Sequence, residues 1–250
     1  MRPLLRPALH AAAMVLIGLA GALAVLPAGW LAAMLPADGV LSVVDASGSI
    51  WAGRARLALG PPGYRRTVPD TVQWRIAWDG GLPQARISHP WLAGPLALRA
   101  GLDGLTLSAQ SLELPASALS LVHDGIRQIG PEGSVRLQWP ATRLGAPPGP
   151  GATRLTLEWL HAASAISPVR PLGSYRGTLR QAADGLDLNL ESRNGPLLLA
   201  GTGRVRAGRL SFDGQASIAP RTDDQTRAAL TPLLRTLGPV ADGQARISLH

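Results

Sequence analysis

The chain has 250 residues, a formal net charge of +8, 46% hydrophobic residues and no cysteine. The absence of cysteine excludes a disulfide framework and a thiolate metal site. All 24 basic residues are arginines scattered along the chain, and no groove-reading or aromatic nucleic-acid element is recognisable, so the sequence predicts no nucleic-acid partner.

The chain begins with an apolar stretch, residues 8–37, which contains no Asp, Glu, Lys or Arg and follows two arginines. A membrane-spanning anchor, a cleavable signal peptide and a buried helix are the alternatives. As a helix, residues 9–35 would span about 40 Å, and stopping before Pro27 would still leave about 27 Å, close to the thickness of the hydrocarbon layer. A signal-peptide core is usually only about 7–15 residues long. The length therefore favours a retained anchor.

The positions of the charges give this anchor an orientation. Arg2 and Arg6 precede it and the first acidic residue, Asp38, follows it, which predicts residues 1–8 inside the cytoplasm and the bulk of the chain outside. Trp30 is expected at the far interface, where indole rings prefer to lie. The residues assigned to the anchor are Leu9, Met14, Leu19, Leu26 and Trp30.

From residue 39 onwards, short runs alternate apolar with polar residues, which is the period of a half-buried strand. Residues 72–78 and 186–191 are clear examples. Turns are predicted where Gly follows Asp or Ala, at residues 79–81, 207–208 and 213–214. Residues 115–122 are expected to form one or two helical turns.

One longer helix is predicted near residues 223–237, because leucines recur there at helical spacing. Gly238 follows, where a left-handed C-terminal residue belongs. Pro232 would interrupt the middle, so the firmer part of the prediction has Thr231 as the N-cap and Pro232 at the first helical position. A last strand is expected at residues 244–249.

A run of Gly, Ala and Pro at residues 145–151 is the strongest break in this pattern. We therefore expect two β-halves, residues 39–145 and 152–250, joined by a connector at residues 146–151. About ten to fourteen strands, each apolar on one side, have a single helix to cover them, so they must curl on themselves. A sandwich, a barrel and a curved groove all satisfy this requirement.

No catalytic or metal-binding motif is found in the sequence. Residues 201–203 begin like a dinucleotide-binding turn, but Arg206 stands where the third glycine belongs. The five histidines stand singly, without the spacing of a zinc site. Four aspartates directly precede glycines, which indicates hairpin turns rather than acid–base pairs: Asp103, Asp184, Asp213 and Asp242. The sequence thus predicts no enzyme, cofactor or metal.

Several stretches together resemble protein N of the bacterial type II secretion system. Ser47-Gly-Ser-Ile-Trp-Ala-Gly53 resembles the family's Gly-x-(Ile/Val/Leu)-Trp-x-Gly element, and Pro171-Leu-Gly-Ser-Tyr-Arg176 resembles its Pro-Leu-Gly-x-Tyr-Arg element. Gly195-Pro-Leu-Leu-Leu-Ala-Gly-Thr-Gly203 and the closing Leu237-Gly238 with Asp242-Gly-Gln-Ala-Arg246 also have family counterparts. The family is distantly similar to AsmA-like proteins, whose sheets curl into a groove.

The resemblance implies an inner-membrane protein with a short cytoplasmic N-terminus and a periplasmic β-domain. The expected fold is mainly β: one transmembrane helix, then a curved antiparallel meander forming a groove or open barrel, and one short C-terminal helix. The expected function is that of an accessory, non-catalytic scaffold or assembly factor that contacts other secretion components. The alternative is a lipid-handling module that shields acyl chains in its apolar groove.

The matched residues are interpreted as structural. Gly48 and Gly53 are expected to permit tight backbone, with Trp51 packed between them and the sheet. In the second motif, which begins at Pro171, Gly173 is expected to make the turn before Tyr175.

Overall fold

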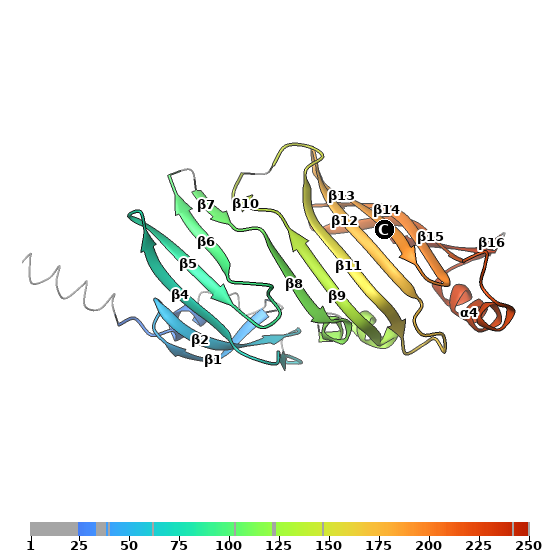
Figure 1. The fold of residues 1–250 in the computed structure, drawn as a ribbon, viewed down its shortest axis with the longest axis horizontal. Helices are drawn as coiled ribbons and strands as arrows, with labels where there is room; N and C mark the ends of the chain where they lie inside the picture. Colours follow the sequence, from blue (N-terminus) through green and yellow to red (C-terminus); the bar gives the residue numbers. More distant parts are fainter. Residues whose placement is uncertain are drawn as a thin grey trace, which may run out of the picture. The chain divides into compact units, whose positions relative to one another are not determined.

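The computed structural model describes residues 25–33, 39, 41–61, 63–102, 104–121, 124–146, 148–241 and 243–249. Antiparallel strands dominate these residues (Figure 1), as the alternating pattern predicted. The chain divides into two units, the first ending at His89 and the second beginning at Pro90. The predicted connector is a loop within the second unit, because the strands on both sides of it pair with each other.

The first unit is a small antiparallel sheet in the order β1-β2-β4-β5, with β3 paired to β2. A short helix, α2 (Gly29–Ala33), precedes it. The predicted hairpin turn is confirmed, since Gly80 and Gly81 have φ angles of 58° and 83° between β4 and β5. The strands are β1 (Leu41–Gly48), β2 (Ala52–Leu59), β3 (Arg66–Thr67), β4 (Val72–Asp79) and β5 (Leu82–Ser88).

The second unit contains a nine-stranded antiparallel sheet in the order β16-β17-β15-β14-β13-β12-β11-β9-β8. The sheet is open, with β8 and β16 at its opposite ends. Its strands are β8 (Gln110–Pro115), β9 (Pro131–Trp139), β11 (Thr153–Ser164), β12 (Gly173–Ala182), β13 (Gly185–Asn194), β14 (Leu197–Arg206), β15 (Arg209–Ile218), β16 (Val240–Ala241) and β17 (Gln244–Leu249).

Further short elements complete the second unit. Three short strands pair in the order β6-β7-β10: β6 (Leu96–Gly101), β7 (Gly104–Leu107) and β10 (Thr142–Arg143). The helical elements are the 3₁₀-helix η1 (Ala116–Leu121), α3 (Asp124–Ile129) and α4 (Asp224–Leu237). The expected helical turns at residues 115–122 are therefore confirmed by η1.

The larger sheet has one apolar and one charged face. Leu179 lies directly opposite Leu188, whereas Arg176 lies opposite Glu191. Opposed residues share a face and successive residues alternate between faces. We call the side with Leu179 and Leu188 the apolar face and the side with Arg176 and Glu191 the charged face.

Two buried clusters cover the ends of the apolar face. In one, α4 contacts β15 and β17, and its leucines form a buried cluster with residues of β14, β15 and β17. The buried members of this cluster are Leu172, Leu197, Ala216, Leu230, Leu233, Leu234 and Ala245. The other, beside η1, consists of Leu114, Ala116 and Val135, with the half-buried Trp91 and Trp159 packed against them. Each fully buried leucine contributes about 1.5–3 kcal/mol.

Helix α4 confirms the predicted range but not the predicted cap. Asp223 is the N-cap and accepts a hydrogen bond from the Thr226 backbone N–H at 2.8 Å, so the helix begins there and continues through Pro232. Thr231 lies inside the helix, where its hydroxyl donates to the Arg227 carbonyl. Gly238 is extended, with φ at 165°, and not left-handed. Glycine is required because a Cβ atom there would overlap the Arg246 carbonyl oxygen.

The turn predicted at residues 213–214 is wrong, whereas the one at residues 207–208 is confirmed. Asp213 and Gly214 lie in the middle of β15, opposite β14. Here the glycine serves close packing, because a Cβ atom on Gly214 would lie 2.7 Å from the ring of Phe212. An Asp-Gly pair therefore marked a crowded strand rather than a turn.

Candidate functional site

The first family-like motif forms the tight connection between β1 and β2. Gly48 has φ at 95°, and a Cβ atom on it would lie 2.5 Å from the Ala52 carbonyl oxygen. A Cβ atom on Gly53 would lie 2.5 Å from the ring of Trp74, which is its direct partner on β4. Both glycines are therefore required by close approach. The ring that lies on Gly53 belongs to Trp74, whereas Trp51 is half-buried in the connection itself.

The same connection binds the segment that precedes the sheet. Ile50 N–H donates to the Leu26 carbonyl at 2.9 Å, and Ala28 N–H donates to the Gly48 carbonyl at 3.0 Å. Pro27 forms an isolated β-bridge with Ser49. Ala28 is fully buried as a result. We call residues 26–28 together with residues 48–51 the N-terminal clasp.

Two further hydrogen bonds tie this clasp to β4. The indole Nε1–H of Trp74 donates to the Ile50 carbonyl at 3.0 Å, and Ile76 N–H donates to the Trp51 carbonyl at 2.6 Å. Ile50 thus accepts from β4 and donates to residue 26, so a single residue links the sheet to the incoming chain. The sequence pattern did not identify Trp74 in this role, because the pairing of Gly53 with Trp74 depends on the register between β2 and β4.

Of the five residues assigned to the anchor, Leu9, Met14 and Leu19 lie outside the described residues. Leu26 lies in the clasp, and Trp30 is the second residue of α2, with 59% of its surface exposed. Within the described part of the chain, no helix has the length and apolar character needed to cross a membrane. A helix running unbroken through residues 9–35 does not fit the clasp, because Pro27 pairs as a strand residue.

The second and third family-like motifs meet in the second unit. Gly173 begins β12, two residues after the cis Arg170–Pro171 peptide bond, and a Cβ atom on it would lie 2.5 Å from the Asn194 carbonyl oxygen. A Cβ atom on Gly195 would overlap the Cα atom of Gly173. Leu197 N–H donates to the Leu172 carbonyl at 3.0 Å. The two motifs therefore form one junction between β12 and the start of β14, which we call the glycine junction.

Tyr175 completes the glycine junction. It is 3% exposed, and its hydroxyl donates to the Leu197 carbonyl at 3.0 Å. Its ring meets the ring of Trp159 with 6.1 Å between centroids. Burial raises the pKa of the Tyr175 hydroxyl, because the charged phenolate would be desolvated there.

The two other glycines of the third motif, Gly201 and Gly203, lie against one aromatic ring. A Cβ atom on Gly201 would lie 2.5 Å from Phe212, and one on Gly203 would lie 3.2 Å from it. Phe212 is the one phenylalanine of the chain and is buried. The ring covers the gap that these glycines leave in the sheet, so the third motif supports packing.

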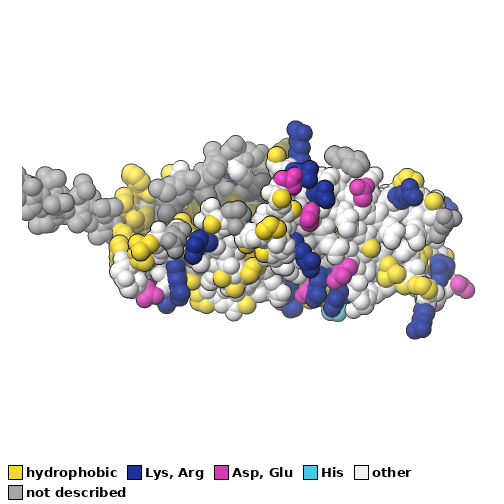
Figure 2. Space-filling view, turned by 90° about the horizontal axis from the view of Figure 1, so that it is seen from above, with side chains coloured by type: hydrophobic (Ala, Val, Ile, Leu, Met, Phe, Trp, Pro, Cys, Tyr) yellow, Lys and Arg dark blue, Asp and Glu magenta, His cyan; other side chains and the backbone are white. Residues whose placement is uncertain are grey.

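A ladder of alternating charges crosses the charged face. Glu113, Arg136, Glu158, Arg176 and Glu191 are directly opposed on five successive strands, β8, β9, β11, β12 and β13. Ion pairs join the first four, at 3.0 Å, 3.9 Å and 2.5 Å in that order. On the side of the molecule seen in Figure 2, basic and acidic side chains are likewise intermixed.

The charged face is also hollowed. A cavity of about 820 Å³ lies over β12 to β15, and its lining includes Arg180, Asp187, Asn189 and Arg204. Arg204 pairs with Asp187 at 3.3 Å, on adjacent strands. This hollow is lined mainly by charged and polar groups, so it is not the apolar groove that the lipid-handling alternative requires.

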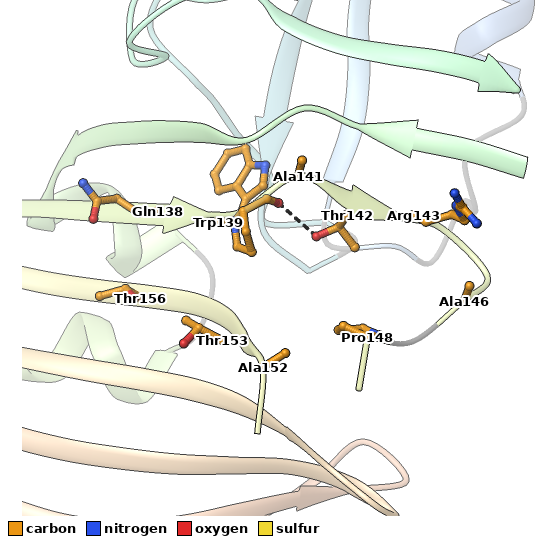
Figure 3. Close-up of a pocket in the computed structure, with 11 residues that line it drawn as sticks. Gln138, Trp139, Ala141, Thr142, Arg143, Ala146, Pro148, Ala152, Thr153 and Thr156 are labelled. Carbon is orange, nitrogen blue, oxygen red and sulfur yellow. Dashed lines mark hydrogen bonds between the residues drawn. The ribbon is translucent and has the colours of Figure 1, made fainter. Parts of the chain in front are cut away.

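Another cavity, of about 790 Å³, lies between the end of β9, β10 and the start of β11 (Figure 3). Thr142 donates from Oγ1 to the Pro140 carbonyl at 2.9 Å. The Trp139 indole Nε1–H is buried and has no hydrogen-bond partner within the described residues. The lining contains no carboxylate among its described members, so it offers no acid–base pair. The lining residues are Gln138, Trp139, Pro140, Ala141, Thr142, Arg143, Ala146, Pro148, Ala152, Thr153 and Thr156.

Among the residues that the structure describes, no group of three or more His, Cys, Asp or Glu side chains could hold a metal ion. His89 and His161 lie in different units, and the other three histidines lie outside the described residues. Among the described residues, the family-like motifs form two sites, the N-terminal clasp and the glycine junction.

Comparisons with known proteins gave one match. A family model described as type II secretion system (T2SS), protein N, matches residues 39–249. No curated protein and no solved structure matches the chain.

Proposed function

We propose that this chain, which belongs to the protein N family of the type II secretion system, is a non-catalytic scaffold or assembly factor of the inner membrane. In this role it assists the export of folded proteins across the outer membrane. Its N-terminus lies in the cytoplasm, the part of residues 9–35 that precedes Pro27 anchors it in the membrane, and the β-units lie in the periplasm. The match covers both β-units, so the family assignment rests on the whole β-rich part of the chain.

The observation that carries the scaffold role is the N-terminal clasp. Backbone hydrogen bonds from Ile50 and Ala28 hold residues 26–28 against the first sheet, so the chain enters that unit at a fixed position. A flexible linker would leave the position of the domain undefined relative to its attachment. A clasped entry fixes it, which is what a docking platform requires.

The edge of the first sheet offers a place for a partner to dock. Val68 N–H donates to the Leu57 carbonyl at 2.7 Å, so the backbone N–H and C=O groups of Leu57 point away from β1. Its partner on β1, Val43, therefore directs its own N–H and C=O outwards. Strand addition to such an edge is a common docking mode. The proposed partners are other secretion components with an extended segment.

Export of secreted enzymes tests the role. Deleting the protein is expected to reduce export, and the intact chain is expected to restore it. Gly53→Leu, which forces a side chain into the ring of Trp74, is expected to restore export poorly. Gly29→Ala is the control, because nothing lies within 4 Å of the added Cβ next to the clasp. Unchanged export of secreted enzymes after the deletion would contradict the proposed role.

Two further experiments examine the anchor and the edge. The protein should stay in the membrane fraction after a high-salt wash, with its N-terminus near Met1, whereas salt release or a mature start near Ala32 would contradict an anchor.

Val43→Pro removes an outward N–H without removing a bond to β2. It is expected to weaken capture of secretion components, and Val43→Thr, which keeps the N–H, serves as the control.

One observation favours the alternative, a lipid-handling module. Between its two covered ends, the apolar face of the larger sheet carries half-buried leucines, among them Leu155, Leu179, Leu188 and Leu190. Acyl chains would cover such a row. Lipid that co-purifies with the intact chain and is lost in Leu188→Gln would support this alternative, and lipid-free protein would contradict it.

A further inference from the structure

Two tryptophans of the first unit are largely exposed. Trp30 is 59% exposed at the start of α2, and Trp78 is 67% exposed near the end of β4. Leu82, across the β4–β5 turn, is also exposed. Tryptophan is buried on average in folded proteins, so two exposed indoles in one small unit require an explanation.

The strand register places Trp78 and Leu82 at one end of the sheet. Ala52, the first residue of β2, pairs with Arg75, so the part of β4 that contains Trp78 runs beyond the start of β2. The clasp lies at this same end, and α2 follows directly from it. Figure 2 shows hydrophobic side chains at the left of the molecule, where Figure 1 places the beginning of the first unit. We call this end, with Trp30, Trp78 and Leu82, the tryptophan end.

The opposite end of the same sheet has a different character. Tyr64, 75% exposed, lies beyond the end of β2 and is followed by Arg65 and Arg66. About ten strand residues separate the level of Tyr64 from that of Trp78, or roughly 30 Å at 3.3 Å per residue. One unit therefore has an exposed aromatic residue at each end, but the uncharged stretch of the sequence enters at only one of them.

The covering partner follows from the chain that leads into the tryptophan end. Residues 8–37 contain no charged side chain, and the clasp fixes residues 26–28 of this stretch against the sheet. Indole rings accumulate at the headgroup level of membranes, where their apolar body and polar N–H are both accommodated. Asp79 pairs with Leu82 across the β4–β5 turn and shares its face, whereas Trp78 lies on the other face of the hairpin, so the two apolar side chains reach the membrane only where the turn meets it end-on. The Asp79 carboxylate then lies at the polar headgroup level, where it stays solvated.

We propose that the tryptophan end of the first unit rests on the membrane surface, with Trp78 and Leu82 inserted at the headgroup level beside Trp30. This inference rests on the membrane anchoring in the proposed function. The domain is then held at the bilayer by two contacts, the anchor and the β4–β5 turn. Two contacts would restrict the tilt of the first sheet relative to the membrane.

The chain lacks cysteine, so single-cysteine labelling tests the contact directly. Leu82→Cys and Tyr64→Cys, each with a nitroxide label, are prepared in the full chain and reconstituted in vesicles of phosphatidylethanolamine and phosphatidylglycerol. The label at residue 82 is expected to show a several-fold higher ratio of oxygen to nickel-chelate collisions than the label at residue 64. Adding Trp78→Ser to the Leu82→Cys chain is expected to lower that ratio towards the value at residue 64.

Equal ratios at residues 82 and 64 would overturn the inference while leaving the anchor intact, provided that the protein still floats with the vesicles. Spin–spin broadening between labels at residue 82 would identify a second copy of the chain as the cover and would also overturn it. Protein that does not float with vesicles at all would contradict the proposed anchoring itself. The circular dichroism spectrum of each labelled chain confirms that it has folded.

Discussion

Gly173 and Gly195 lie so close together that a Cβ atom on Gly195 would overlap the Cα atom of Gly173. Gly195 also has φ at 114°, in the region that favours glycine. These two residues come from two separate sequence motifs, and their contact brings β12 next to the segment that starts β14. The motifs are thus two sides of one packing contact.

Gly195→Ala is expected to destabilise the second unit strongly. The positive φ costs an L-residue roughly 1–2 kcal/mol, and overpacking typically costs about 1–3 kcal/mol more. We expect a loss of about 3 kcal/mol in the free energy of unfolding, measured by urea denaturation. Gly208→Ala is the matched control, because φ is 77° there but nothing lies within 4 Å of the added Cβ. Equal losses in the two variants would show that the contact with Gly173 contributes nothing.

Tyr175 is expected to give the protein a stability that falls in alkali. Burial raises its pKa, so the folded state holds the phenolic proton more tightly than the unfolded chain, where tyrosine titrates near pH 10. The contribution is fully present below about pH 10 and is lost as the pH rises above it. Tyr175→Phe should lose about 1 kcal/mol at neutral pH, with the hydrogen bond to Leu197, and should show a smaller alkaline loss. Denaturant unfolding at pH 8 and pH 11 measures both, and identical alkaline losses would contradict the assignment.

The period of two made most of the strands predictable, because one face of each strand is buried. Residues 186–191 alternate leucine with Asp, Asn and Glu, and the structure places them in β13 with the leucines on the apolar face. The last strand, at residues 244–249, has the bounds that its pattern predicted. This information is local, so it can be taken from the sequence alone.

The errors came from glycines and prolines whose partners are distant in sequence. Gly214 was assigned to a turn, but it makes room for Phe212, and Gly238 was assigned a left-handed conformation, but it avoids the Arg246 carbonyl. Pro232 was expected at a helix start, but Asp223 supplies the cap eight positions before Thr231. A glycine selected for close approach and one selected for a turn look alike until the facing residue is known.

The clasp shows the same limit. Its glycines were identified in the sequence, but its main partner, Trp74, lies 21 positions after Gly53 and belongs to another strand. The hydrogen bond from Trp74 to Ile50 depends on register, which the alternating pattern does not specify between strands. The motif could therefore be recognised in the sequence, but its contacts with Trp74 could not be predicted from it.

Asp223 is expected to make α4 sensitive to acid. The backbone hydrogen bond from Thr226 lowers the pKa of this carboxyl group, so its contribution is present above the unfolded pKa and is lost as the pH falls through the folded one. Asp223→Asn keeps a capping side chain and should remove that part of the acid dependence, whereas Asp223→Ala should lower stability at neutral pH as well. Unfolding curves at pH 7 and pH 3 separate the two effects. An unchanged acid dependence in Asp223→Asn would assign it to other carboxylates.

Glu158 lies at the centre of the charge ladder and should be its most sensitive member. It pairs with Arg136 at 3.9 Å and with Arg176 at 2.5 Å, and its side chain is less exposed than either arginine. Glu158→Gln leaves two adjacent arginines without the charge between them, so we expect a loss of about 1–2 kcal/mol at low salt. The loss should shrink in 1 M salt, where the Debye length falls to about 3 Å. Glu191→Gln, at the end of the ladder, is the control and should cost less than half as much. A loss that is independent of salt, or equal in the two variants, would show that the ladder contributes through packing and not through charge.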